Sequence, residues 1–301
     1  MTMTIPSFNY TLGFGTNPHP LNWYGERAVH WSGYITSAVN VIDYNTIASA
    51  GNATDFGDMT ITLYMPSACS NSVRGIASGG HTGSAQPASI DYITIATTGN
   101  ASDFGDTSLG ASFKMSCSDG SRGVITAGYQ NTNVIDYVTI ETTSNTSDFG
   151  DLNVISYAGA GLADATRGVF AGGSGGNVIQ YITIQTTGNA SDFGDLLTSK
   201  NYTSGCSDRT RGLISGAYHA PQNVIEYITI QTTGNSVDFG DLTTDRHTVG
   251  SSANGIRALL AGGGTSPTNR IDYVTVQTTG NGTDFGDLTV ARGWLSSCSG
   301  T

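Results

Sequence analysis

The stretch Asn223-Val-Ile-Glu-Tyr-Ile-Thr-Ile-Gln-Thr-Thr-Gly-Asn-Ser-Val-Asp-Phe-Gly-Asp241 contains two strand-like segments and the turn that joins them. Its β-branched and aromatic residues favour strands, and its Gly-Asn pair supplies the positive φ angles that a tight hairpin requires. The closing tetrapeptide Asp-Phe-Gly-Asp occurs six times, at intervals of 48, 45, 44, 46 and 46 residues, which suits one four-stranded propeller blade per copy. The copies begin at Asp55, Asp103, Asp148, Asp192, Asp238 and Asp284.

The unit that ends at this tetrapeptide divides into four short segments separated by turn residues. No segment has an apolar period of 3.6 residues long enough for a helix, and the abundant Gly disfavours helix locally. The sequence therefore predicts an all-β chain built from four-stranded antiparallel blades. In the fullest unit, which begins at residue 196, the expected strands are 202–206, 211–216, 223–230 and 236–242.

The two ends of the chain match complementary halves of one blade. Residues 287–300 reproduce a first strand and then stop, whereas residues 27–34 match a second strand, in register with residues 74–80. A C-terminal first strand that joins the N-terminal blade would close a six-bladed β-propeller and leave no free sheet edge in the ring. We therefore expect one propeller domain over residues 27–301, preceded by an N-terminal arm of residues 1–26. The repeats end near Asp58, Asp106, Asp151, Asp195, Asp241 and Asp287.

Three features of each unit resemble a kelch blade: a second strand that ends in Gly-Gly, a Tyr in the third strand and an aromatic residue in the fourth. The fourth-strand aromatic is Phe, where the kelch family usually has Trp. The second strand ends in Gly-Gly in three units, at Gly79-Gly80, Gly172-Gly173 and Gly262-Gly263. In the other three units one of the two Gly residues is replaced, at Ser32-Gly33, Ala127-Gly128 and Gly216-Ala217. The third-strand residue is Tyr44, Tyr92, Tyr137, Tyr181, Tyr227 and Tyr273.

The resemblance covers nearly the whole chain after residue 26 and implies the propeller fold. It specifies function poorly, because kelch-like propellers serve as enzymes, adaptors and adhesins. Near-identical units of this type are also similar to the kelch-like virion proteins of tailed bacteriophages. That similarity implies a non-enzymatic module on a virion, in a tail, a fibre or the capsid surface, that mediates protein or host-surface attachment. The alternatives are a glycan-binding lectin or glycan-active propeller enzyme, and an intracellular kelch-type adaptor.

Most charged residues are repeat positions. The six tetrapeptides hold 12 of the 23 acidic residues, and one repeated Arg position holds six of the 12 basic ones. Because guanidinium binds carboxylate bidentately, we expect one Arg-carboxylate bridge in each blade. The alternative is a calcium site at each Asp pair, which is disfavoured because calcium takes six to eight oxygen ligands. We expect neither metal nor cofactor. The repeated arginines are Arg27, Arg74, Arg122, Arg167, Arg211 and Arg257.

No catalytic residues are expected. The five His residues fall in different blades and at different blade positions, so no triad or metal cluster follows from their spacing. The four Cys residues share one repeat position, which is Leu162 and Ser252 in the other two units. This interchange is typical of a small packing site, so we expect reduced thiols. The cysteines are Cys69, Cys117, Cys206 and Cys298.

The net charge of −11 and the pI of about 4.6 argue against nucleic acid as a partner. No apolar run reaches the length that crosses a bilayer, so no membrane insertion is expected. The N-terminus lacks the basic start and long apolar core of a conventional secretory signal. A composition with few charged residues and many Thr, Ser, Gly and Asn is typical of virion or extracellular surfaces. The expected partners are other virion or surface proteins or a cell-surface glycan, with a homo-oligomer formed through the N-terminal arm.

The units differ most in the loops between the second and third strands, which lie on one rim of a propeller. The three Trp residues form a second group of candidates, because all fall on or beside the closing blade. They either secure closure by aromatic packing or form a platform for carbohydrate. The candidate binding residues are His81, Gln86, Gln130, Asn131, His219, Gln222, Trp23, Trp31 and Trp294.

Asn-x-Ser/Thr sequons recur in the hairpin between the third and fourth strands. They are glycosylation sites only in a eukaryotic secretory route. The simpler interpretation is that each Asn occupies a left-handed turn position. The sequons begin at Asn52, Asn100, Asn145, Asn189 and Asn281.

Overall fold

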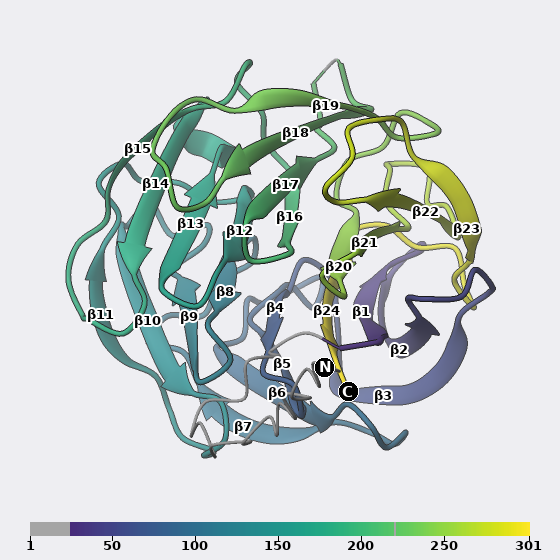
Figure 1. The fold of residues 1–301 in the computed structure, drawn as a ribbon. Coiled ribbons are helices and arrows are strands. Elements are labelled where there is room, and N and C mark those ends of the chain that lie inside the picture. Colours follow the sequence, from purple (N-terminus) through teal and green to yellow (C-terminus); the bar gives the residue numbers. More distant parts are fainter. Residues whose placement is uncertain (1–24, 220) are drawn as a thin grey trace, which may run out of the picture.

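The computed structural model describes residues 25–219 and 221–301 (Figure 1). Six four-stranded antiparallel sheets surround one axis, which confirms the predicted six-bladed propeller. The first strand of each sheet contacts the first strands of both neighbouring sheets and lines the axis. Residues 1–24 of the predicted N-terminal arm lie outside the described residues.

Each blade runs from an inner first strand to an outer fourth strand. Blade 1 consists of β24 (Ser296–Gly300), β1 (Arg27–Tyr34), β2 (Ala38–Thr46) and β3 (Thr54–Leu63). Blade 2 consists of β4 (Ser67–Ser70), β5 (Arg74–Ser78), β6 (Ser89–Thr94) and β7 (Ser102–Asp106). Blade 3 consists of β8 (Ser116–Ser118), β9 (Arg122–Thr126), β10 (Val134–Thr139) and β11 (Ser147–Asp151).

The remaining three blades follow the same order. Blade 4 consists of β12 (Ala160–Ala163), β13 (Arg167–Ala171), β14 (Val178–Thr183) and β15 (Ser191–Asp195), with the short 3-10 helix η1 (Gly173–Gly175) before β14. Blade 5 consists of β16 (Ser204–Ser207), β17 (Arg211–Ser215), β18 (Val224–Thr229) and β19 (Val237–Asp241). Blade 6 consists of β20 (Gly250–Ala253), β21 (Arg257–Ala261), β22 (Arg270–Thr275) and β23 (Thr283–Asp287).

Blade 1 is built from both ends of the chain, as the complementary ends predicted. β24 pairs antiparallel with β1, in a register that places Trp31 opposite Ser296. Close to this pairing, the guanidinium of Arg292 lies 2.7 Å from a carboxylate oxygen of Asp43, and both side chains are completely buried. Main-chain hydrogen bonds and a buried ion pair therefore close the ring together.

The tetrapeptide packs neighbouring blades against each other. Its Phe is buried in every copy, and the ring meets the third-strand Tyr edge to face, with centroids 6.0 to 6.2 Å apart. The following Gly approaches the next blade so closely that a Cβ there would lie 2.4 to 2.5 Å from a backbone oxygen. Any larger residue would push the two blades apart, which explains why Gly recurs in all six copies.

The repeated arginines do not bridge the repeated aspartates, so that prediction is wrong. Each guanidinium lies over the third-strand Tyr ring of its own blade, 4.2 to 4.8 Å from the centroid. It also donates a hydrogen bond to a backbone carbonyl of the next blade, as Arg167 does to Ile230 at 2.9 Å. The first Asp of every tetrapeptide is exposed on the fourth strand, and in blade 6 Asp284 lies 3.8 Å from Arg270, which is not one of the repeated arginines.

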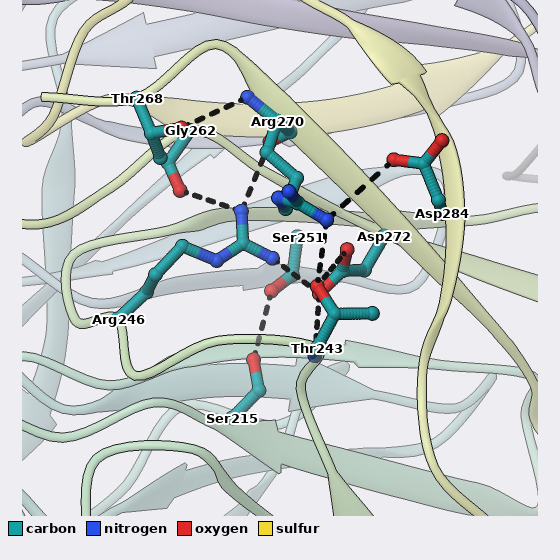
Figure 2. A network of polar contacts seen from close by, with 9 residues as sticks. All are labelled: Ser215, Thr243, Arg246, Ser251, Gly262, Thr268, Arg270, Asp272 and Asp284. Atoms are coloured by element: carbon teal, nitrogen blue, oxygen red, sulfur yellow. Dashed lines mark hydrogen bonds and ion pairs between the residues drawn. The ribbon is translucent and has the colours of Figure 1, made fainter.

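The buried carboxylates occupy a different repeat position, directly before the third-strand Tyr. In blade 6 this residue is Asp272, which accepts hydrogen bonds from the backbone and hydroxyl of Thr243 at 3.0 and 2.7 Å (Figure 2). It also pairs with Arg246 at 2.5 Å, and Arg246 donates to two further backbone carbonyls. In the described part of the chain, the other buried ion pairs are Lys200–Glu226 and Arg292–Asp43.

The hairpin Asn residues connect blades, and the predicted left-handed conformation is wrong, since none of them has a positive φ angle. The side-chain oxygen of each accepts the backbone N–H of the last Asp in the preceding tetrapeptide, at 3.0 to 3.1 Å. Asn235 makes the same bond although it is not in a sequon. The repeat therefore requires the Asn for contact between blades.

The four thiols are free and buried, which confirms the predicted packing site. A Cβ added at Gly75, Gly123 or Gly168 would lie within 2.7 to 3.1 Å of a Cys Sγ in the preceding blade. Burial raises the pKa of the Cys298 thiol to about 11, so it stays protonated at neutral pH. The Cys side chains thus fill the space above a Gly of the neighbouring blade.

Candidate binding face

The connections between strands lie on two opposite faces of the propeller. The chain passes from the second to the third strand, and from the fourth strand to the next blade, on the side that we call the connection face. The other side, the hairpin face, carries the turns between strands one and two and the hairpins between strands three and four. Around blade 2, the connection face carries residues 79–88 and 107–115, and the hairpin face carries residues 71–73 and 95–101.

Six residues at one repeat position form a closed annulus on the connection face. Each is the seventh residue after a tetrapeptide, and each has a φ angle between 56° and 61° although none is Gly, Asn or Asp. Backbone N–H groups join neighbours at 2.6 to 3.2 Å, and the N–H of Trp294 closes the ring on the hydroxyl of Thr248 at 3.3 Å. A left-handed conformation costs about 1–2 kcal/mol per residue, and such strain concentrates at functional sites. The annulus is Met65, Phe113, Ala158, Tyr202, Thr248 and Trp294.

Three aromatic rings of the annulus meet one another at the axis, and we call them the axial cap. The ring centroids of Phe113 and Tyr202 are 5.0 Å apart, those of Tyr202 and Trp294 5.2 Å, and those of Phe113 and Trp294 5.7 Å, all edge to face. The three residues precede the first strands of blades 3, 5 and 1. Non-aromatic residues occupy the alternate positions, so the rings fit around the axis, each with part of its surface exposed.

A hollow of about 600 Å³, open solvent included, is lined by the axial cap and by residues of the first strands. Lys114 is the one charged side chain among the described residues that line it. Its ammonium donates to the carbonyl oxygens of Leu109 and Ala127 at 3.0 and 3.3 Å. Burial lowers the pKa of Lys114 to about 8, although nearby Asp136 opposes the shift. The hydroxyls that line the hollow belong to Ser67, Ser116, Thr203, Ser204, Thr248, Ser251, Ser296 and Ser297.

Three aromatic pairs, which we call the rim pairs, lie on the connection face at alternate junctions between blades. In each pair, a Tyr at the end of the second strand of one blade or shortly after it contacts a ring that precedes the first strand of the next blade. Tyr129 and Tyr218 are 53% and 40% exposed, so large parts of their rings are open to solvent. The pairs are Tyr34–Tyr64, Tyr129–Tyr157 and Tyr218–His247, with centroids 5.1, 4.9 and 5.0 Å apart.

The rim pair between blades 5 and 6 adjoins polar atoms that have no hydrogen-bond partner in the described chain. His247 is buried, and burial lowers its pKa, so the ring is neutral at pH 7 and both nitrogens are unpaired. The side-chain oxygens of Asn201 and Thr203 are also buried and unpaired. Buried polar groups normally bond to protein, ligand or water. These atoms therefore favour a polar ligand group at this junction.

The loop residues predicted from the sequence lie on the connection face, where they have different roles. Gln86, Gln130 and Gln222 bond to backbone groups of the connections, so their amides hold loop conformations. His81 packs on Tyr64, with ring centroids 5.2 Å apart. Of the predicted loop residues, Gln130, Asn131 and His219 are exposed.

The tryptophans do not act as one group. Trp31 is completely buried and its indole N–H points to the Sγ of Cys298 at 3.3 Å, so its ring has no surface for a ligand. A carbohydrate platform that includes Trp31 is therefore excluded. Trp294 belongs to the axial cap and is partly exposed. Trp23 lies outside the described residues.

Sequence reasoning missed the axial cap and most of the rim pairs. The signal is present in the aligned repeats: the seventh residue after the tetrapeptide, which precedes the first strand of the next blade, is aromatic before blades 1, 3 and 5 and non-aromatic before blades 2, 4 and 6.

No protein-family model matches the chain, and no curated protein matches it. Among the described residues, no three His, Cys, Asp or Glu side chains form a group that would hold a metal ion. No helix in residues 25–219 or 221–301 is long and apolar enough to cross a membrane.

Proposed function

We propose that the protein is a non-enzymatic binding module, displayed on a virion as a tail, fibre or capsid-surface component, that attaches to a partner protein or host surface. The observation that carries this proposal is the gathering of the axial cap, the rim pairs and the variable loops on the connection face. Aromatic side chains supply large contact areas with few rotatable bonds, and they are enriched where proteins bind. On the hairpin face, the hairpins between strands three and four instead repeat nearly the same sequence in every blade.

Exposed apolar side chains support the same face. Eleven large hydrophobic residues are exposed in the described chain. Seven of them lie on connections of this face, and an eighth, Ile61, lies near the end of β3 that leads into one of these connections. Apolar groups gathered on one side of a soluble protein favour an interaction surface there. The eight are Ile61, Leu109, Tyr129, Val154, Ile155, Leu197, Tyr218 and Val290.

His30 and the three buried ion pairs have structural partners among the described residues, with His247 as the exception, and this supports a binding role over a catalytic one. His30, for example, lies between the hydroxyl of Ser297 at 2.8 Å and the amide oxygen of Asn45 at 3.0 Å. Burial, with the nearby charge of Arg292, lowers the pKa of His30 to about 4, so it stays neutral at physiological pH. This histidine joins β1, β2 and β24 at the ring closure.

A loop graft tests the proposal. We expect that replacing residues 81–87 and residues 219–222 with copies of Ser174-Gly-Gly-Asn177 leaves the fold intact, because these loops lie outside the packed blades. Attachment should weaken at least about tenfold, which is about 1.4 kcal/mol, because the graft removes contacts from two blades. The measurement is retention of the variant by the particles or cells that bind the unaltered chain.

The control replaces Val73 and Ile256 on the hairpin face with Ser. Both side chains are more than half exposed, at 55% and 66%, so they are the hydrophobic groups of that face most open to a partner. We expect the control to attach like the unaltered chain. Full attachment of the graft together with a loss in the control would place the interface on the hairpin face.

A further inference from the structure

The connection face has threefold order, although the blades repeat six times. In blades 1, 3 and 5 a Tyr lies at the end of the second strand or shortly after it, and an aromatic ring of the axial cap precedes the first strand. In blades 2, 4 and 6 the second strand ends in strict Gly-Gly, and the residue before the annulus position is a Tyr or His. The chain is therefore three pairs of blades, and each pair of blades carries one rim pair.

Crowding at the axis explains only part of this alternation. Three large rings fill the axis where six would collide, which accounts for Phe113, Tyr202 and Trp294. The rim tyrosines lie outside that crowded region, and Tyr129 and Tyr218 are 53% and 40% exposed. Tyr34 is half-buried, so the ring is largely exposed in two of the three alternate blades. Large aromatic side chains left exposed at the same place in different blades are typical of a contact surface.

Uncharged polar groups surround the rim pairs. The residues that follow the three tyrosines include Thr36, Ser37, Gln130, Asn131, His219 and Gln222, whose hydroxyls, amides and imidazole form hydrogen bonds. Formal charge is absent from these loops. The nearest charged residues in the sequence are Asp245 and Arg246, directly before His247, and Arg246 is buried in its ion pair with Asp272. A ligand that fits this chemistry has an apolar surface for the Tyr ring, several hydroxyls at its edge and no charge.

We infer that each rim pair binds a neutral saccharide, which gives three equivalent sites on one chain. The C–H face of a pyranose packs on the exposed ring of Tyr129 or Tyr218 or on the accessible part of the half-buried Tyr34 ring, and its hydroxyls bond to the adjacent loop. The unpaired nitrogens of His247 and oxygen of Asn201 supply further partners at the third site. This inference rests on the proposed function, because it names the ligand class of the same face.

The test is a titration of the full chain with four neutral disaccharides: lactose, maltose, cellobiose and chitobiose. The concentration is raised to about 10 mM, because a contact as small as one sugar ring is expected to have a Kd of about 1 mM. Saturation-transfer NMR identifies the ligand and calorimetry gives the number of sites. We expect three sites for at least one disaccharide. Tyr34→Ala, Tyr129→Ala and Tyr218→Ala should each leave two sites, a loss of one third of the binding capacity.

Matched variants separate stacking from damage to the fold. Tyr129→Phe keeps the ring and should retain three sites, and Ile256→Ala on the hairpin face should also retain three. Binding of none of the disaccharides, or one site lost with Trp294→Ala and unaffected by the Tyr variants, would overturn the inference. The proposed function would stand if the loop graft still abolished attachment, and the partner would then be a protein.

Discussion

Removing residues 288–301 is expected to abolish cooperative unfolding and to make the protein aggregate. The deletion removes β24, which pairs with β1 as the inner strand of blade 1. It leaves an unpaired strand edge in the ring, and such edges pair with other molecules. The expected loss is comparable with the whole stability of a domain, about 5–15 kcal/mol. Size-exclusion chromatography and thermal unfolding measure the two effects.

The structure gives physical reasons for so large an effect. The deletion takes away Arg292 and leaves the fully buried carboxylate of Asp43 without its cation. It also removes Ser297 and Cys298, which bond to the side chains of His30 and Trp31. Removal of Thr301 alone is the control and should change little. A monomeric 288–301 deletion with an unchanged melting temperature would contradict the closure described here.

Arg292→Ala is expected to destabilise the protein by about 3–5 kcal/mol, the usual cost of stranding one partner of a buried ion pair. Arg292 is completely buried, donates to the carboxylate of Asp43, and donates also to backbone oxygens of Ser32 and His30. Denaturant unfolding measures the loss. The substitution acts on the closing blade alone and leaves every strand present.

Arg167→Ala is the matched control because its guanidinium pairs with no carboxylate. It lies over the ring of Tyr181 at 4.3 Å and donates to the carbonyl oxygen of Ile230. Losing one cation–π contact and one hydrogen bond should cost about 1–2 kcal/mol. Equal losses of stability in the two variants would contradict the conclusion that Arg292, in the ion pair of the closing blade, contributes more to stability than the repeated Arg167. A small loss for Arg292→Ala would show that the buried pair contributes little to closure.

The fold was predictable because the same local pattern recurs six times. The spacing of Asp-Phe-Gly-Asp set the blade size, and the incomplete units at the two ends predicted the pairing that β24 and β1 make. The packing role of the Cys position followed from its interchange with Leu162 and Ser252. Repetition helps in these cases because every copy of the repeat must satisfy the same packing requirement, so the residues that satisfy it recur along the chain.

Repetition did not reveal which charged groups meet. Arg167 and Asp192 recur equally often, so their frequencies suggested a pair, yet Asp192 is exposed and Arg167 lies on Tyr181. The buried carboxylate is Asp272 in blade 6, whose cation, Arg246, comes from a connection that differs between blades. Contacts between blades depend on three-dimensional register, which spacing along the chain leaves open.

The candidate site was only partly predictable. The loops of the connection face stood out by their variation, and Gln130 and Asn131 indeed lie beside Tyr129. The axial cap did not stand out, because positive φ angles are expected at Gly and Asn and these positions hold Phe113, Tyr202 and Trp294. The hydrogen-bonded annulus that holds them in this conformation joins residues from six separate units.

Hydroxyl-radical footprinting tests most directly whether the connection face is the binding surface. The chain is oxidised free and then bound to the particle or cell surface that retains it, and modification is read residue by residue. We predict that Tyr129 and Tyr218 become protected on binding, while Val73 and Ile256 on the hairpin face react as before. Protection of Val73 and Ile256 with unchanged oxidation of the two tyrosines would contradict the account.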